Sequence, residues 1–253
     1  MKIIPVPVLS DNYAYLLVDQ GSQTAAAVDP AEPDTVIRAA QAEGVQIVQI
    51  LTTHKHWDHS GGNSGMASQI PGIEVVGGSN EGVDACTKTV QDNEEFTFGD
   101  INIRCMHTPG HTMGHICYYV TEGEDKAVFT GDTLFIGGAG KFFEGTAEDM
   151  YPSLYQKLGA LPTDTKVYCG HEYTLSNYRF ALHIDPDNAE LQSQNAWARQ
   201  QVNNGLPTVP STIANELATN PFMRATDPSL QEKTGKSDPI QCLAAIRQMK
   251  NRF

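Results

Sequence analysis

The sequence predicts an α/β fold built from layers of sheet and helix, followed by a separate helical region. Up to residue 171, short apolar segments with strand character alternate with helical patterns, whereas from residue 172 apolar residues recur with helical spacing. In addition, four of the apolar segments end next to His or Asp side chains. A layered α/β fold gathers a site from its loops in this way, so the ends of these strands are expected to carry the function.

The elements expected in the first part follow one another closely. Residues 25–29 form a short strand, and Pro33 suits the first turn of a helix that ends at Gly44. Residues 45–53 then form a buried strand, and the sheets continue with strands at residues 73–76, 101–106, 115–120, 126–130 and 165–170. Residues 137–140 lack the sequence context of a phosphate loop and are interpreted as a flexible turn near the site.

The carboxyl-terminal part is expected to be helical. Breaker sequences, DPDN and GLPTVPS, separate segments with helical periodicity at residues 172–184, 187–204 and 239–253. We therefore expect two domains, with a catalytic domain over residues 1–171 and a helical domain over residues 172–253.

The most informative segment is Thr-His-Lys-His-Trp-Asp-His, which follows the strand at residues 45–53. An extended backbone points His54 and His56 in the same direction, so both can bind one metal ion. Beyond the turn, Asp58 and His59 can face a second ion. A solvated, His-rich turn is the alternative, but the preceding apolar strand and further candidate ligands downstream argue against it.

Three more candidate ligands lie at strand ends. His111 follows a Pro-Gly turn after an alternating strand, Asp132 ends an apolar strand at residues 127–132, and His171 ends the strand at residues 165–170. Mixed histidine and carboxylate ligands suit zinc, iron or manganese. Two such ions can generate hydroxide at neutral pH, which points to a metal-dependent hydrolase.

Composition excludes several classes of protein. The net charge of −13, from 30 acidic and 17 basic residues, argues against a nucleic-acid surface. The sequence has no apolar run long enough to span a membrane and no recognisable export signal, so a cytoplasmic protein is expected. Five scattered cysteines outside any CxxC spacing indicate reduced thiols.

The order HxHxDH, His, Asp, His is that of the metallo-β-lactamase superfamily, and the resemblance extends further. The chain closely resembles glyoxalase II, also called hydroxyacylglutathione hydrolase, and its eukaryotic cytosolic form most. The matching segments are LSDNYAYLLVD, VDPAEP, LTTHKHWDHSGGN, TPGHTMGHICYYV, FTGDTLFIGGAGKFFEGTAEDMY, VYCGHEYTLSNYRFA, TNPFMR and DPIQCLAAIRQMKNRF. This resemblance implies a metallo-β-lactamase-type αββα sandwich with a carboxyl-terminal helical domain.

The resemblance also assigns the ligands. It implies one metal ion at His54, His56 and His111, a second at Asp58, His59 and His171, and Asp132 bridging both, with zinc expected and iron or manganese possible. Asp58 and Asp132 would be the catalytic carboxylates, together with a hydroxide held by the metals. Family members often have His where this chain has Lys55, and the lysine is expected to add a surface charge and little else.

The activity implied by the resemblance is hydrolysis of S-D-lactoylglutathione, and other S-2-hydroxyacylglutathiones, to D-lactate or another 2-hydroxy acid and glutathione. This thioesterase step is the second of methylglyoxal detoxification. The glutathione moiety would contact Lys141, Phe143, Tyr173, Arg247 and Lys250, in a chain expected to be a monomer. Many relatives have Tyr where this chain has Phe143, so a hydroxyl contact is expected to be missing and affinity to be lower.

Three alternatives remain open from the sequence. A mononuclear-iron persulfide dioxygenase, or another hydrolase of the superfamily, would share the strand-end ligands but is expected to lack the long carboxyl-terminal region with its Arg and Lys. A β-lactamase is expected to carry an export signal. A non-catalytic metal-binding module usually has four ligands and not seven. Outside the ligand set, His115 and Asp29 are expected to support the site.

Overall fold

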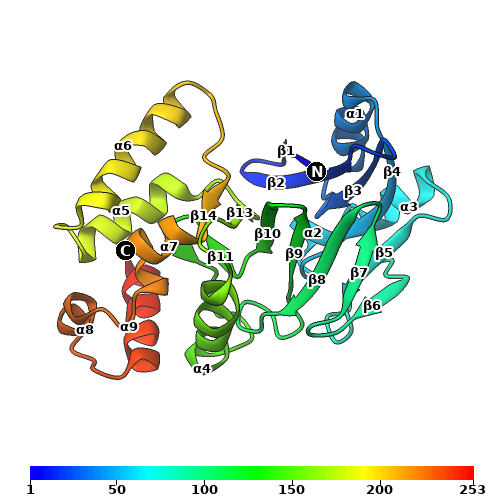
Figure 1. The fold of residues 1–253 in the computed structure, drawn as a ribbon. Coiled ribbons are helices and arrows are strands. Elements are labelled where there is room, and N and C mark those ends of the chain that lie inside the picture. Colours follow the sequence, from blue (N-terminus) through cyan, green and yellow to red (C-terminus); the bar gives the residue numbers. More distant parts are fainter.

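The computed structural model describes all residues from Met1 to Phe253. Two six-stranded sheets lie face to face, with helices on both outer faces (Figure 1). The first sheet has the order β1-β2-β3-β4-β5-β6, comprising β1 (Lys2–Val8), β2 (Asn12–Asp19), β3 (Thr24–Val28), β4 (Gln46–Leu51), β5 (Glu74–Gly78) and β6 (Lys88–Val90). The expected αββα sandwich is confirmed.

The second sheet has the order β14-β13-β10-β9-β8-β7. Its strands are β7 (Glu95–Phe98), β8 (Ile101–His107), β9 (Ile116–Glu122), β10 (Asp125–Gly131), β13 (Lys166–Cys169) and β14 (Ser211–Thr212). A separate hairpin pairs β11 (Leu134–Phe135) with β12 (Gly138–Ala139). Since β14 comes from the carboxyl-terminal part, that part also completes the edge of the second sheet.

The helices divide into two groups. Those of the sandwich are α1 (Pro33–Glu43), α2 (Trp57–Ser60), α3 (Asn63–Gln69), α4 (Ala147–Tyr151), η1 (Pro152–Lys157) and η2 (Leu158–Ala160). The carboxyl-terminal group is α5 (Thr174–Ile184), α6 (Ala189–Asn203), α7 (Ile213–Thr219), η3 (Pro221–Met223), α8 (Pro228–Thr234) and α9 (Pro239–Arg252). This second group gathers at one end of the sandwich, on the left in Figure 1. No helix is both long and apolar enough to cross a membrane.

Strand alternation explains the layers. In β2, Leu17 packs into the core between the sheets, whereas its neighbour Leu16 packs on the outer face under α1. In β10, Phe129 faces the same central core and Val128 faces the outer cluster of α4 and α9. Both faces of these strands are therefore buried, and each fully buried Leu or Phe contributes about 1.5–3 kcal/mol.

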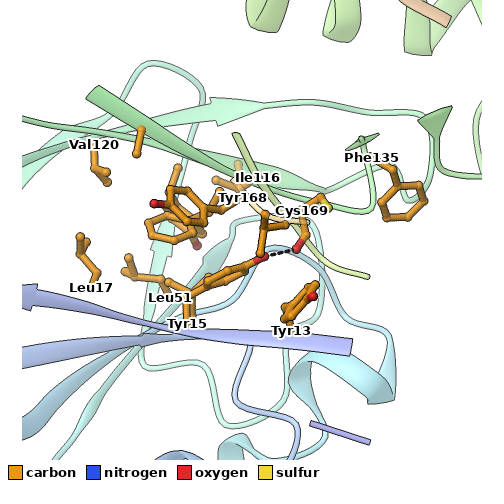
Figure 2. Packing of buried hydrophobic residues seen from close by; sticks show 14 of the residues in the cluster. Tyr13, Tyr15, Leu17, Leu51, Ile116, Val120, Phe135, Tyr168 and Cys169 are labelled. Carbon is orange, nitrogen blue, oxygen red and sulfur yellow. Dashed lines mark hydrogen bonds between the residues drawn. The ribbon is translucent and has the colours of Figure 1, made fainter. Parts of the chain in front are cut away.

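Aromatic side chains tie the two sheets together beneath the site. Figure 2 shows Tyr15 from the first sheet among residues of the second, where its hydroxyl donates a hydrogen bond of 2.5 Å to the carbonyl of Cys169. The Tyr15 ring lies 5.3 Å from that of Tyr168, edge to face. This contact fixes β13, and with it the loop that carries His171, against β2.

The prediction of a flexible turn at residues 137–140 is wrong. Gly137 has a positive φ of 66°, as a tight turn requires, but the segment is buried and belongs to the hairpin of β11 and β12. The Gly137 N–H donates to the buried carboxylate of Glu216, and Asn220 donates to the carbonyls of Phe135 and Gly138. Helix α7 and the residues after it therefore hold this hairpin, which is not a flexible loop.

Candidate active site

Three imidazoles from two loops form the first group of candidate ligands. His54 and His56 follow β4, and His111 lies between β8 and β9. Nδ1 of His56 lies 3.0 Å from Nε2 of His54 and 3.0 Å from Nε2 of His111. The structure thus brings together the three side chains expected to hold one metal ion.

The second group comes from helix α2 and the end of β13. Nε2 of His59 lies 3.3 Å from Nε2 of His171. Oδ2 of Asp58 lies 3.7 Å from Nε2 of His59 and 3.5 Å from Nε2 of His171. The turn of α2 therefore directs Asp58 and His59 away from the first group and towards His171.

Asp132 lies between the two groups. Its Oδ2 atom is 3.4 Å from Nε2 of His111 in the first group and 3.5 Å from Nε2 of His171 in the second. Its Oδ1 atom is 3.3 Å from Nε2 of His59. One carboxylate can therefore reach ions in both groups, as the resemblance implied for this residue.

Hydrogen bonds to Nδ1 fix the tautomers of His59 and His54. Nδ1 of His59 lies 3.0 Å from Oδ2 of Asp29, and because a carboxylate only accepts, Nδ1 carries the proton. The hydroxyl of Thr53 donates to the same carboxylate at 2.7 Å, so its oxygen accepts from Nδ1 of His54 at 3.0 Å. In the neutral form of both rings, Nε2 is then left with its lone pair.

His111 and His171 also carry a proton on Nδ1, because each lies next to an oxygen atom that only accepts. Nδ1 of His111 donates to the carbonyl oxygen of Lys141 at 2.9 Å, and Nδ1 of His171 donates to Oδ1 of Asp11 at 2.9 Å. The Nε2 lone pairs of the neutral rings therefore point into the cluster, where the Nε2 atoms of His59 and His171 lie 3.3 Å apart. Such lone pairs repel unless a cation lies between them, and this arrangement is typical of metal-binding histidines.

The local electrostatics also favour positive charge at the centre. Burial and nearby imidazoles lower the pKa of His54 well below its usual range. Burial also acts to lower the pKa of His59, but the carboxylates of Asp132 and Asp29 outweigh it and the net shift is upward. For Asp132 burial acts to raise the pKa, yet His59 and His171 lower it well below its usual range. The carboxylate is thus ionised at neutral pH.

The unsatisfied atoms and the available space fit bound metal ions. Oδ1 of Asp132 is buried and accepts no hydrogen bond, which is costly unless another positive group meets it. A Cβ at Gly170 would lie 2.5 Å from this atom, so only glycine leaves room there. The seven imidazole and carboxylate side chains therefore suit two divalent cations, and this chemistry fits zinc, iron or manganese.

His115 lies behind the cluster and is not among the groups that could hold an ion. Its ring stacks on that of His54 with 5.0 Å between centroids, and its Nε2 accepts a hydrogen bond of 3.2 Å from the Asp132 N–H. His115 therefore positions both a histidine and the central carboxylate, in line with the supporting role expected for it.

Glu81 is a supporting residue that the sequence did not reveal. This buried carboxylate accepts from the Lys55 N–H at 3.0 Å, the Thr112 hydroxyl at 2.6 Å and the Gly114 N–H at 2.8 Å. It therefore joins the loop that follows β4 to the loop between β8 and β9. Glu81 lies in a polar loop with no pattern around it, so only tertiary structure identifies it.

Asp11 and Asn12 were also missed as site residues, although the family resemblance included their segment. The Asn12 amide donates to Oδ2 of Asp58 at 3.1 Å, and Asp11 orients His171 as described above. Asn12 begins β2 and Asp11 directly precedes it, so their position at a strand end was the one available signal.

A pocket of about 240 Å³ opens beside the cluster. Its lining includes His111 and Asp132 from the candidate metal centre together with all five residues expected to bind substrate, Lys141, Phe143, Tyr173, Arg247 and Lys250. The helical region and the sandwich thus meet at one pocket next to the candidate metal ligands.

Two cations of α9 face this pocket without a carboxylate partner. The Arg247 side chain is buried, donates from Nη1 to the carbonyl of Ala139 at 2.9 Å, and leaves Nε without a partner. Lys250 donates to Oδ1 of Asn177. Burial lowers the pKa of Arg247 to about 10, and burial together with the charge of Arg247 lowers the pKa of Lys250 to about 7. An anion in the pocket would relieve this mutual repulsion.

Aromatic rings flank the histidines on the pocket side. The exposed ring of Phe143 lies 5.2 Å from the ring of His111 and 5.9 Å from that of His56. Tyr173 stacks on His171 with 4.6 Å between centroids, and burial raises the pKa of its hydroxyl to about 12. Tyr173 thus keeps a protonated hydroxyl at the pocket, whereas Phe143 offers none.

Lys55 does more than add a surface charge, which corrects the sequence-based expectation. Its side chain is partly exposed, and its Nζ atom lies 2.6 Å from Oε1 of Glu144. The neighbouring opposite charge raises the pKa of Lys55 and lowers that of Glu144. The pair links the loop after β4 to the loop that carries Phe143.

Two family models together match nearly the whole chain. The model for the metallo-beta-lactamase superfamily matches residues 8–171, and the model for the hydroxyacylglutathione hydrolase C-terminus matches residues 172–253.

Similar proteins cover the chain from end to end. A protein of Arabidopsis thaliana named hydroxyacylglutathione hydrolase cytoplasmic is 53% identical over 100% of this chain and 99% of its own length. A hydroxyacylglutathione hydrolase-like protein of Gallus gallus is 45% identical over 100% of this chain and 90% of its own length. Among solved structures, ETHE1 from Myxococcus xanthus superimposes with a TM-score of 0.72 at 25% identity, covering 98% of this chain and 90% of that one.

Proposed function

Because the chain belongs to the hydroxyacylglutathione hydrolase family of the metallo-β-lactamase superfamily, we propose that it hydrolyses S-D-lactoylglutathione and other S-2-hydroxyacylglutathiones. The products are D-lactate, or another 2-hydroxy acid, and glutathione. In a cell this reaction is the second step of methylglyoxal detoxification.

The proposed ligand sets follow the two groups of side chains. One ion is held by His54, His56 and His111, the other by Asp58, His59 and His171, and Asp132 bridges both. The interatomic distances within each group and the fixed Nδ1 protons of the buried rings support this assignment. We propose zinc as the native metal, with iron or manganese chemically possible.

The two ions, when bound, supply a hydroxide nucleophile at neutral pH and stabilise the oxyanion that develops on the thioester carbonyl. The chain's own residues position the reactants. Asp58 accepts from Asn12 and is placed to orient the nucleophile, and Asp132 holds both ligand groups in register. The leaving thiol of glutathione departs as a thiolate, since its free pKa is about 8.5, so no strong general acid is required.

Substrate recognition is proposed for the other wall of the pocket. Arg247 and Lys250 are three positions apart on one face of α9, and the glycine carboxylate of glutathione is an anion that both can bind. Tyr173 can donate its hydroxyl to the peptide, while Lys141 and Phe143 line the pocket from the loop after β12.

One observation carries this proposal. The unpaired cations of α9 and the candidate metal ligands His111 and Asp132 line the same pocket. A substrate with an anionic end and a scissile carbonyl can therefore engage both at once. A generic metal hydrolase has no need for the two buried cations.

The organisation of the protein completes the proposal. We propose a catalytic domain over residues 1–171 and a substrate-binding helical domain over residues 172–253, acting in a monomer in the cytoplasm. The matched family models and the name of the Arabidopsis relative support the division and the location.

The direct test is thiol release from S-D-lactoylglutathione by the purified, metal-loaded protein, followed with a thiol reagent. Efficient release, with much slower hydrolysis of a small acyl thioester that lacks the glycine carboxylate, is the expected result. Absence of thiol release, together with oxygen uptake in the presence of glutathione persulfide, would instead indicate the sister dioxygenase activity.

A further inference from the structure

We propose that Lys55 and Glu144 form a clamp that fixes the loop of residues 141–145 and thereby sets the affinity for substrate, an inference that rests on the proposed function. Lys55 stands where family members often have His, and in this chain its side chain reaches Glu144. Both residues are positioning residues, because neither lines the pocket nor belongs to the candidate ligand groups.

One carboxylate joins three loops. Oε1 of Glu144 lies 2.6 Å from Nζ of Lys55, and Oε2 accepts a hydrogen bond of 2.9 Å from the Met113 N–H. Lys55 belongs to the loop that carries His54 and His56, and Met113 to the loop that carries His111. Glu144 therefore ties the 141–145 loop to both loops of the first ligand group.

The anchor on the opposite side is rigid. The backbone N–H of Lys55 donates to the buried carboxylate of Glu81, which also binds the Gly114 N–H. The base of the clamp is thus fixed from beneath by a buried glutamate. The other end of the clamp is the 141–145 loop, to which Glu144 belongs.

This loop carries groups whose positions matter for the pocket. Phe143 is 64% exposed, so its ring is positioned by edge contacts with His111 and His56 and by the backbone on either side. The carbonyl of Lys141 accepts from Nδ1 of His111, and the Gly145 N–H donates to the carbonyl of Gly110 at 3.0 Å. Between these two backbone contacts, Glu144, the residue next to Phe143 in the sequence, adds side-chain contacts with Lys55 and with the Met113 N–H.

A partly exposed ion pair contributes little to the free energy of unfolding. Breaking the Lys55–Glu144 pair is therefore expected to change substrate affinity and to leave global stability nearly unchanged. Loss of the clamp allows the loop to sample positions in which Phe143 and Lys141 no longer line the pocket, and binding is weakened by the fraction of time spent there. The expected increase in KM is about two- to five-fold. Turnover should stay within about two-fold, because the ligand side chains keep their own buried supports.

The test uses variants of the metal-loaded full chain. Lys55→Met removes the cation at similar length, and Glu144→Gln removes the charge while its amide oxygen still accepts from Met113. Each should raise KM for S-D-lactoylglutathione by the stated factor, and the double variant should be no worse than either single one, because the pair acts as a unit. Lys55→Arg should restore the wild-type KM. Lys126→Met is the matched control, since it breaks a 2.8 Å pair with Asp164 at the far end of β10 and should change neither constant.

Hydrogen exchange gives a readout that does not depend on activity. Backbone amides of residues 141–145 should exchange faster in Lys55→Met than in the wild type, with no change in metal content. A wild-type protein without thioesterase activity would overturn the proposed function, while the exchange comparison would still decide the clamp. Unchanged exchange in the loop, or additive KM effects in the double variant, would overturn the clamp.

Discussion

Around Asp132, every candidate ligand lies at the end of a strand or in the turn beyond it, and Nδ1 of each buried histidine donates to a polar partner. Across the pocket, Arg247 and Lys250 project from one helix and lack a carboxylate partner. The first region is pre-organised before any substrate arrives, and the second presents unpaired charge that a substrate can satisfy.

This difference separates two kinds of work. Pre-organised groups lower the barrier of the chemical step, because they need no rearrangement when charge develops. Contacts remote from the scissile bond are similar in the ground and transition states, so they act mainly on KM. Changes among the candidate ligands around Asp132, called the strand-end cluster below, should therefore lower kcat. Changes at Arg247 or Lys250 on α9, called the helical wall below, should raise KM.

The largest effect is expected at Asp132. Asp132→Ala removes the carboxylate proposed to bind both ions and leaves the imidazoles without the negative charge between them. Loss of a partner that only supports a ligand costs about 10- to 100-fold, so the loss of turnover here should exceed 100-fold. Metal analysis should show fewer than two ions per chain. Full activity with one tightly bound ion would contradict the dinuclear assignment.

A smaller loss is expected when the support behind a ligand is removed. Asp29 has a positive φ of 47°, which Asn tolerates, and it accepts from His59 and from Thr53. Asp29→Asn replaces one acceptor oxygen by an NH2 group. Oδ1 of Asp29 accepts from the Thr53 N–H, and Oδ2 accepts from the Thr53 hydroxyl and from Nδ1 of His59, so in either orientation of the amide a buried donor beside His59 loses its acceptor. Metal affinity, measured by competition with a chelator, should fall about 10- to 100-fold. The exposed Asp187→Asn serves as control, and equal affinity in the two variants would refute the role of Asp29.

The helical wall should show a pH dependence of its own. Burial lowers the pKa of Lys250 to about 7, so in the free enzyme Lys250 is charged below pH 7 and neutral above it. The ratio of kcat/KM between wild type and Lys250→Met should be about ten at pH 6 and approach one by pH 9. Taking the ratio cancels every other ionisation that the two proteins share. A ratio that does not change across this range would show that Lys250 does not titrate there.

The smallest effect is expected at Phe143. Phe143→Tyr adds the hydroxyl that many relatives have, and its exposed ring at the pocket leaves space for it. One added hydrogen bond should lower KM about two- to five-fold with kcat unchanged. An unchanged KM would indicate that this position does not contact the peptide.

Most of the sandwich could be predicted because its strands are apolar and end in polar turns. The strand at residues 45–53, the helix that begins at Pro33 and the long carboxyl-terminal helices all have their structural counterparts. The two-residue strand β14 had no such signal, because it lies in a segment that resembles a breaker. Strand β1 was hidden by Pro5 and Pro7, which its edge position tolerates because the missing N–H groups are not needed there.

The site also contains residues that the sequence predicted and residues that it did not. Its candidate ligands were readable because several His and Asp side chains cluster at strand ends, and this pattern is rarely produced by chance. Glu81 and Glu144 were not readable, since their contacts depend on loops that meet only in the folded chain. The consequence of Lys55 was missed for that reason, because its partner lies far away in the sequence.

The central claim is that the strand-end cluster catalyses hydrolysis of the thioester and that the helical wall binds the glutathione part of the substrate. Steady-state kinetics of His59→Ala and of the Arg247→Ala, Lys250→Ala double variant with S-D-lactoylglutathione test it most directly. We predict a large fall in kcat with little change in KM for His59→Ala. For the double variant we predict KM raised about ten-fold or more with kcat nearly unchanged. A double variant that matches the wild type, or an unchanged kcat in His59→Ala, would contradict the account.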